Sequence, residues 1–177
     1  HDMIPVLTVE QIRAAEADAD KLGYVYARMM QDAGNAVAEL AVSRAREFYP
    51  SAPRFTLLIG SGHNGGDGLV AATRLRELLP ESQVRCLMLV RRDDDPLFEA
   101  AASAGVFFAY IEDDHDGRVI KQMVGSADII IDALFGFGVR LPIREAGQKM
   151  LRFARQAYNE HTAARRPRPL NDPTLGG

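Results

Sequence analysis

The stretch from Leu57 to Leu75 constrains the fold of this chain more than any other. An apolar run breaks into five glycines within nine residues and then resumes with helical periodicity. An apolar strand, a glycine turn and a helix in this order bring backbone N–H groups and a helix N-terminus to one point, where an anion can bind. Residues 129–142 follow a similar order. Together the two segments predict a nucleotide-sized ligand at the carboxyl ends of parallel strands.

Strand and helix patterns alternate along the rest of the chain. Strands are predicted over residues 55–59, 83–90, 106–111 and 128–134. Helices are predicted from the end of the glycine turn to about residue 79, and over residues 96–104 and 118–124. The last strand is almost wholly apolar, which is typical of a strand covered on both faces. This alternation predicts an α/β fold, a three-layer αβα Rossmann-like sandwich with a mostly parallel central sheet.

Two N-terminal helices are expected before the first strand. Thr8 and Gln11 form a capping-box pattern, which predicts a helix that Gly23 ends. A second helix is expected over residues 24–48. Gly34 inside this second helix is less favourable than alanine by ~1 kcal/mol, which indicates close packing or ligand approach. Packing is the default interpretation.

The length of 177 residues predicts one domain, over residues 4–158, followed by an extended or disordered tail over residues 159–177. The net charge of −3 gives no electrostatic case for nucleic acid, and no apolar run approaches the ~20 residues that span a bilayer. We therefore expect a cytoplasmic protein that binds neither nucleic acid nor membrane. The single cysteine, Cys86, excludes an internal disulfide and is expected to be a buried thiol.

The glycine turn contains G-x-G-x-x-G over residues 60–65, in the strand-turn-helix context of dinucleotide-binding proteins. Gly66 and Asp67 follow, with neither lysine nor serine or threonine, which excludes a Walker phosphate loop. Asp67 would repel a phosphate unless it binds a cation, accepts from a hydroxyl or caps the following helix. The capping and functional interpretations both stay open. His63 has no serine or cysteine partner in a motif, so we interpret it as a polar loop residue.

Two oxygen donors are expected at strand ends. Asp132 ends an apolar strand, so its carboxylate should lie at the ligand crevice of a parallel sheet, where a charge needs a partner. Asn64 follows the end of another strand. Carboxylate and amide oxygens suit a hard cation rather than zinc. The sequence therefore predicts a cation site that contains Asn64 and Asp132.

Two motifs closely resemble the YjeF N-terminal domain family, whose best-known members are NAD(P)H-hydrate epimerases. The motifs are Gly62-His63-Asn64-Gly65-Gly66-Asp67-Gly68 and Asp132-Ala133-Leu134-Phe135-Gly136-Phe137-Gly138. Met29-Met30-Gln31-Asp32-Ala33-Gly34 is similar to a third family motif. The likeness covers roughly residues 6–157, and the two glycine motifs together are quite specific.

The resemblance implies an isomerase that interconverts the R and S epimers of NADHX and NADPHX in nicotinamide cofactor repair, functionally linked to an NAD(P)H-hydrate dehydratase. It also implies a homodimer and a potassium ion, with Asn64 and Asp132 as two of the ligands. The substrate-binding residues it implies are His63, Asn64, Gly65, Gly66, Asp67, Gly136, Phe137, Gly138, Val139, Arg140, Leu141 and Pro142.

The sequence departs from the family pattern in two places. The family usually has asparagine at the position of His63, which changes the donors at the apex of the turn. The family also continues with an apolar strand that ends in Asp-Ile-Pro-Ser-Gly and supplies a presumed catalytic aspartate. Only residues 172–174, Asp-Pro-Thr, are a faint echo of it. The catalytic residue is therefore left unassigned.

Two alternatives stay open beside the epimerase. The departure at the Asp-Ile-Pro-Ser-Gly segment favours a non-catalytic nucleotide-binding or dimerisation scaffold of the same fold, whereas Asn64 and Asp132 favour the enzyme. An ordinary NAD(P)-dependent oxidoreductase explains the G-x-G-x-x-G pattern alone. It explains neither residues 66–68 nor the second motif, and no Tyr-x-x-x-Lys-like pair is found.

Overall fold

The structure, a computed structural model, describes residues 8–49, 51–134, 136–140, 152–153, 155–156, 158–160 and 163. The elements are α1 (Val9–Phe48), β1 (Arg54–Ile59), α2 (His63–Leu78), β2 (Gln83–Met88), α3 (Pro96–Ser103), β3 (Phe107–Tyr110), the 3₁₀ turn η1 (Ile111–Asp113), α4 (Arg118–Gly125), β4 (Ile129–Ala133) and β5 (Gly138–Arg140). The first four strands lie where the alternating pattern predicts them, and β5 was not predicted as a strand.

The strands form one sheet in the order β3-β2-β1-β4-β5. Strands β3, β2, β1 and β4 are mutually parallel, and β5 pairs with β4 in the antiparallel direction. The chain moves outward from β1 to β3 and then returns to the other side of β1 to form β4. In open α/β sheets such a reversal of strand order creates a crevice beyond the carboxyl ends of the two central strands. Here those strands are β1 and β4.

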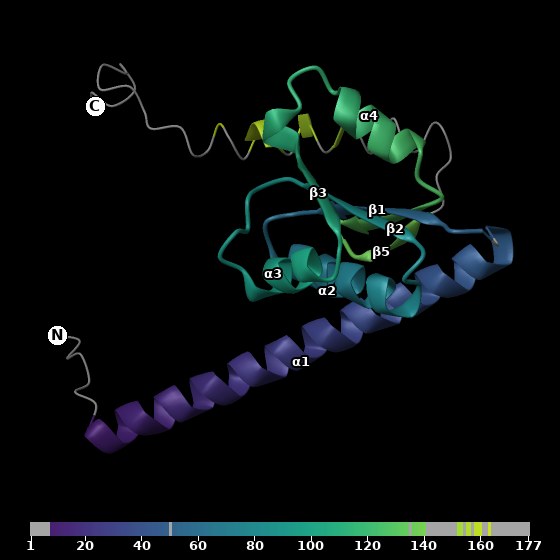
Figure 1. Cartoon of the computed structure of the whole chain (residues 1–177). Helices are drawn as coiled ribbons and strands as arrows, with labels where there is room; N and C mark the ends of the chain where they lie inside the picture. Colours follow the sequence, from purple (N-terminus) through teal and green to yellow (C-terminus); the bar gives the residue numbers. More distant parts are fainter. Residues whose placement is uncertain are drawn as a thin grey trace, which may run out of the picture.

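Helices cover both faces of the sheet and confirm the predicted three-layer αβα sandwich (Figure 1). One face packs against α1, α2 and α3, and the other packs against α4. Strand β4, with Ile129, Ile130 and Ile131, is buried along its whole length because both layers contact it. Its apolar sequence is explained by this position.

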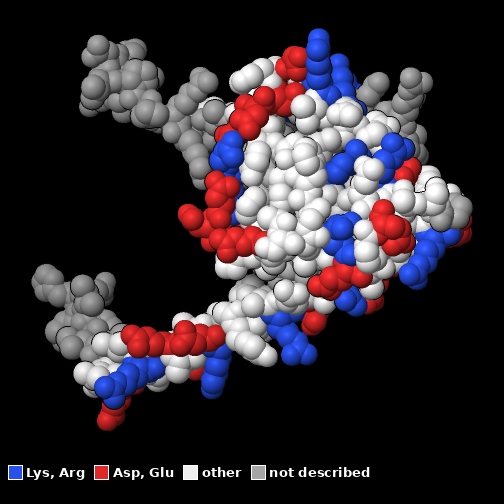
Figure 2. Space-filling view, in the orientation of Figure 1, with Lys and Arg blue, Asp and Glu red and all other residues white. Residues whose placement is uncertain are grey.

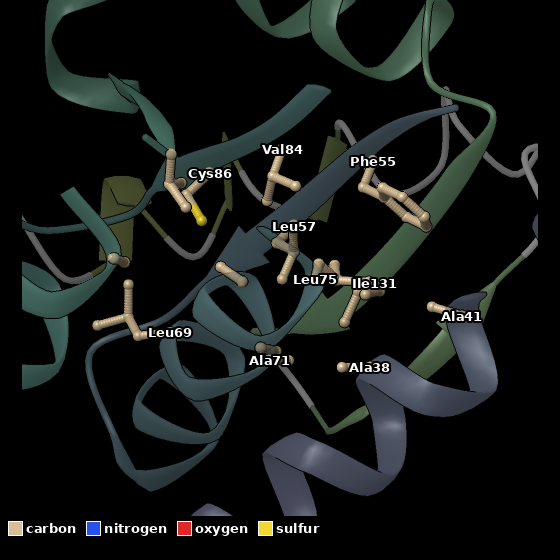
Figure 3. Packing of buried hydrophobic residues seen from close by; sticks show 14 of the residues in the cluster. Ala38, Ala41, Phe55, Leu57, Leu69, Ala71, Leu75, Val84, Cys86 and Ile131 are labelled. Carbon is tan, nitrogen blue, oxygen red and sulfur yellow. The ribbon is translucent and has the colours of Figure 1, made fainter. Parts of the chain in front are cut away.

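Successive residues of each central strand contribute to opposite cores. Phe55 and Leu57 face α2 and α1 (Figure 3), whereas Leu58 packs with the residues of α4 on the other face. Cys86 points into the same core as Leu57 and is fully buried, which confirms the predicted structural thiol. Burial raises the pKa of the Cys86 thiol well above its ordinary value.

The N-terminal residues form one helix of 40 residues, α1, where the sequence predicted two helices. The predicted capping box is present: Thr8 Oγ1 accepts from Gln11 N at 3.1 Å, and Thr8 N donates to Gln11 Oε1 at 2.9 Å. Gly23 does not end the helix. No other part of the described protein lies within 4 Å of a Cβ placed there, so nothing forces a turn. An exposed glycine destabilises a helix by only ~1 kcal/mol, which the favourable residues around it can offset.

Only the C-terminal half of α1 packs on the sheet and α2. Gly34, Ala38 and Ala41 are buried there, whereas residues 8–29 are all exposed. The exposed part projects from the body of the domain, as Figures 1 and 2 show. At ~1.5 Å per residue, it is about 30 Å long. Charged side chains are spread along this part (Figure 2). No helix in the described ranges is long and apolar enough to cross a membrane.

Helical structure continues beyond the predicted domain boundary at Tyr158. Asn159, Glu160 and Ala163 are helical, and Tyr158 itself packs against the core that α4 covers. These residues differ from the extended tail predicted to begin at residue 159. The rest of the predicted tail lies outside the described residues.

Candidate functional site

The glycine turn lies at the crevice between β1 and β4. Gly60 N donates to Ala133 O at 3.1 Å, and a Cβ on Gly60 would lie 3.3 Å from the carbonyl oxygens of Ala133 and Leu134. Gly62 is the N-cap residue of α2, and no side chain caps this helix. The first N–H groups of a helix have no intrahelical partners. The turn therefore presents an uncapped helix N-terminus at the crevice, where an anion is favoured.

Three glycines of the first motif allow close packing. A Cβ on Gly65 would overlap Gly60 O, and one on Gly66 would lie 2.7 Å from Met30 Sδ of α1. A Cβ on Gly68 would lie 2.6 Å from Ala133 Cβ of β4. These glycines therefore let the start of α2 approach α1, β4 and its own preceding turn. Their presence follows from packing around the turn.

His63 is the first residue of α2, where the sequence predicted a loop position. Its ring stacks on Tyr26 of α1, with 5.9 Å between the centroids and 18° between the planes. Asn64, the next residue, is exposed in the same first turn. The helix therefore begins earlier than predicted, and its first two residues are polar and exposed.

Asp67 does not cap α2. The N-cap position belongs to Gly62, and Asp67 lies in the second turn of the helix, so the capping interpretation is wrong. Its carboxyl group is half-buried, and this burial raises its pKa, while the neighbouring His63 lowers it. A half-buried carboxyl beside the predicted ligand site is a candidate functional group.

Asp132 is only 5% exposed at the end of β4, as predicted. Its Oδ1 accepts from Leu134 N at 2.9 Å, and its Oδ2 lies 3.4 Å from Arg140 Nε. Arg140 is 61% exposed, so the guanidinium reaches the buried carboxylate from the surface side. The β4–β5 pairing, which places Gly138 opposite Asp132, brings Arg140 into range. The buried Asp132 carboxylate was predicted to need a partner, and Arg140 is one.

The second glycine segment forms a hairpin with β4. Gly138, Val139 and Arg140 form the antiparallel edge strand β5, and Phe137 packs with Val139 against the core that α1 and α2 share. Gly136 is partly exposed in the turn. The hairpin places this segment beside the crevice. Leu141 and Pro142, also predicted as substrate-binding residues, lie outside the described residues.

The donor set at the crevice fits a monovalent cation. Asn64, in the first turn of α2, carries an amide oxygen, and Asp132 carries a buried carboxylate with one negative charge at the end of β4, the strand that pairs with β1. Hard cations prefer such oxygen ligands. In the part of the chain that the structure describes, no group of three or more His, Cys, Asp and Glu residues could hold a metal. A site with a single carboxylate is better matched to one positive charge than to two.

Three residues of the site were not assigned from the sequence. Arg92 and Asp95 follow β2, and Arg92 Nη1 donates to Gly60 O at 3.2 Å and to Gly62 O at 3.0 Å. Tyr26 reaches His63 from α1. The Asp95-Pro96 pair carries a helix-start signal, because aspartate is a good N-cap and proline suits the first turn. No local pattern connects Arg92 or Tyr26 with the glycine turn.

Residues 26–165 match the family described as YjeF-related protein N-terminus. The chain belongs to this family. The match begins at Tyr26, where α1 reaches the first turn of α2, and contains both glycine motifs. Most of the exposed half of α1 precedes it. The family membership confirms the resemblance drawn from those motifs.

The relatives include epimerases and larger repair enzymes. The chain is 30% identical over 157 residues to the NAD(P)H-hydrate epimerase of Yarrowia lipolytica, covering 85% of this chain and 60% of the relative. It is 32% identical to the bifunctional NAD(P)H-hydrate repair enzyme Nnr of Escherichia coli, covering 87% of this chain and 28% of the relative. The chain therefore spans less than two thirds of either protein.

A solved structure has the same fold. The crystal structure of the yeast protein ynu0 aligns with a TM-score of 0.50 at 22% identity, covering 83% of this chain and 63% of the yeast chain. This similarity supports the mixed α/β architecture described above.

Proposed function

We propose that this domain interconverts the R and S epimers of NADHX and NADPHX. The observation that carries the proposal is the juxtaposition of Asp132 with the uncapped start of α2 at the crevice between β1 and β4. Relatives named NAD(P)H-hydrate epimerase and repair enzyme Nnr match the same domain. The ligand is thus a hydrated nicotinamide dinucleotide.

Binding uses two parts of the crevice. The N–H groups at the start of α2 bind the negatively charged diphosphate, because the helix N-terminus carries a partial positive charge. The half-buried Asp67 and the side chains of His63 and Asn64 line the region next to it. Gly136 and Arg140 border the other side, from the β4–β5 hairpin.

A potassium ion binds Asn64 and Asp132 in this proposal. The ion would neutralise the buried carboxylate and offset the repulsion between that carboxylate and the ligand diphosphate. Among the described residues, Arg140 brings a positive group to Asp132, with 3.4 Å between Arg140 Nε and Asp132 Oδ2. Because Arg140 is largely exposed, its guanidinium can share the carboxylate with the ion and still remain in contact with water.

The reaction is tested with separated R-NADHX. We expect purified protein to accelerate formation of S-NADHX, followed by chromatography, with potassium chloride present. A matched reaction with sodium chloride tests the ion. Conversion at the spontaneous rate, at high protein concentration and with potassium, would remove the enzyme function.

A binding measurement separates the enzyme from the scaffold alternative. We expect Asp132→Asn to abolish the thermal stabilisation that NADPH gives the wild-type protein, because the proposed potassium ion loses its carboxylate ligand. Asp18→Asn, on the exposed half of α1, is the matched control and should keep the shift. Stabilisation by NADPH without epimerisation would favour the non-catalytic nucleotide-binding scaffold.

The same proposal includes the partners and compartment expected from the sequence. We propose a homodimer in the cytoplasm, as expected from the sequence. We also propose that it works beside an NAD(P)H-hydrate dehydratase, since the Escherichia coli relative is named a bifunctional repair enzyme. Size-exclusion chromatography with light scattering tests the dimer: a monomer mass at micromolar concentration would contradict it.

A further inference from the structure

Arg92 has surroundings unlike those of its neighbour Arg91. The Arg92 side chain is 15% exposed and lies under the glycine turn, whereas that of Arg91 is 47% exposed. Arg91 pairs with Glu112 and lies over the ring of Tyr110 at the surface. Two consecutive arginines after the same strand therefore do different things. Only Arg92 is directed toward the crevice.

The Arg92 guanidinium joins the glycine turn to the start of α3. Its Nη1 donates to the carbonyl oxygens of Gly60, at 3.2 Å, and Gly62, at 3.0 Å. Its Nε and Nη2 donate to Asp95 Oδ2, at 2.9 and 2.7 Å. The other oxygen of Asp95 accepts from Leu97 N at 2.9 Å as the N-cap of α3. Asp95 thus holds the guanidinium in one orientation.

Gly65 indicates how closely the turn wraps around this guanidinium. A Cβ on Gly65 would lie 2.7 Å from Arg92 Nη1 and would also overlap Gly60 O. Any larger residue would push the guanidinium away from the two carbonyl groups. The glycine at this position is therefore matched to the arginine as well as to the turn.

The two carbonyl groups determine where their peptide N–H groups point. A trans peptide unit is planar, with C=O and N–H in opposite directions. Because the oxygens of Gly60 and Gly62 converge on one nitrogen of Arg92, the N–H groups of Ser61 and His63 point away from it. Ser61 and His63 are exposed, so these N–H groups face the open side of the turn. Gly62 O also accepts from Gly66 N at 3.3 Å, whereas Arg92 is the cation that orients Gly60 O.

We propose that Arg92 is a positioning residue that presets the N–H groups of Ser61 and His63 as a pair of donors for a diphosphate. The guanidinium withdraws the carbonyl oxygens, which would repel an anion, and leaves the N–H groups at the ligand side. Charge-assisted hydrogen bonds of this kind are short and strong, and the fork of arginine suits two acceptors better than lysine does. The identity of the ligand as a dinucleotide with a diphosphate rests on the proposed function, whereas the contacts of Arg92 with the turn are independent of it.

The test compares ligands with and without a diphosphate. Calorimetric titration with ADP-ribose, inorganic pyrophosphate and adenosine is carried out on the wild type, Arg92→Ala, Arg92→Lys and Arg91→Ala. We expect Arg92→Ala to weaken ADP-ribose and pyrophosphate about tenfold or more, as for the loss of one to two hydrogen bonds to an anion. Adenosine should change less than twofold. Arg92→Lys should lie between, and Arg91→Ala, the neighbouring change of equal charge, should match the wild type.

Chemical rescue measures whether an added guanidinium restores affinity, which it would not do if Arg92 only stabilised the fold. Methylguanidinium at millimolar concentration should restore pyrophosphate affinity to Arg92→Ala and leave Arg91→Ala unchanged. Equal weakening of all three ligands, or full affinity in Arg92→Ala, would overturn the proposal. If Arg92→Ala unfolds, the comparison of pyrophosphate with adenosine in Arg92→Lys decides.

The role of Arg92 and the epimerase proposal can fail separately. Loss of diphosphate affinity in Arg92→Ala, together with no epimerisation by the wild type, would support the role of Arg92 and remove the enzyme function. Epimerisation by the wild type, together with a ligand affinity that does not depend on Arg92, would support the enzyme function and remove the role of Arg92. A wild type that binds neither ADP-ribose nor pyrophosphate would overturn both.

Discussion

The two halves of α1 belong to one continuous helix but have opposite surroundings. Residues 34–45 bury Gly34, Ala38 and Ala41 against α2 and the sheet, whereas residues 9–29 are exposed throughout. Small residues let the packed half approach its neighbours, since a Cβ on Gly34 would lie 2.6 Å from Val70 Cβ. Before Tyr26, which stacks on His63, the described contacts of the exposed half are a capping box and local helix propensity. A continuous helix can therefore be stabilised by tertiary packing in one part and by local interactions in another.

The boundary between these halves coincides with the candidate site. Tyr26 contacts His63, and Met30 lies against Gly66, so the first turn of α2 is where α1 begins to pack. The family match also begins at Tyr26. The packed half of α1 is thus part of the domain that carries the glycine motifs, and substitutions in the two halves should have different effects.

The largest effect is expected for Gly34→Val. The new side chain would overlap Val70 and force α1 from α2, so we expect a loss of about 2–3 kcal/mol in the free energy of unfolding, measured by urea denaturation. Gly23→Val, in the exposed half, is the matched control and should not destabilise the protein. Equal effects of the two substitutions would contradict the packing difference.

A smaller loss is expected for Tyr26→Ala. Removing the ring that stacks on His63 should lower the free energy of unfolding by about 0.5–1.5 kcal/mol, whereas Tyr26→Phe should retain most of it. Tyr24→Ala is the control, because Tyr24 is 68% exposed on the same helix. If Tyr24→Ala and Tyr26→Ala have the same midpoint in urea, the stack does not join α1 to α2.

Gly23→Ala should stabilise the exposed half. Alanine in an exposed helix interior is favoured over glycine by about 0.5–1 kcal/mol, so the helical circular dichroism signal should rise and persist to higher temperature. A glycine that ends a helix in the left-handed conformation would instead make alanine unfavourable. A weaker helical circular dichroism signal in Gly23→Ala would therefore indicate that a helix ends at Gly23, as the sequence predicted.

The smallest effect is expected for Asp67→Asn and depends on pH. Burial raises the pKa of Asp67 in the folded protein, so the folded state binds the proton more tightly than the unfolded state. This contribution to stability is complete below the unfolded value, near pH ~4, and is lost as the pH rises through the folded value. Relative to the Asp67→Asn variant, the wild type should therefore be most stable at low pH. Urea denaturation from acidic to neutral pH measures the difference, and a gap that widens in the opposite direction would contradict the assigned cause.

Local signals were sufficient for much of the fold and part of the site. The apolar strand, glycine turn and helix follow in the predicted order over residues 55–78, although α2 begins inside the predicted turn. Asp132 lies at the end of β4 as predicted, because alternation and apolar runs reflect burial directly. The predicted helix end at Gly23 was wrong, because a glycine ends a helix only where another conformation is more stable. Arg92 could not be assigned, because its partners Gly60 and Gly62 are distant in the sequence and are met only once β1 and β2 pair.

The divided surroundings of α1 have a consequence for amide hydrogen exchange. In residues 9–25, the described structure has no buried contact that opposes fraying, so exchange there should proceed through local opening at rates close to those of an isolated helical peptide. Around Ala38 and Ala41, exchange should require the sheet and α2 to open as well. One helix would then contain two cooperative units, and the change of protection along it should fall where Tyr26 and Met30 reach the glycine turn.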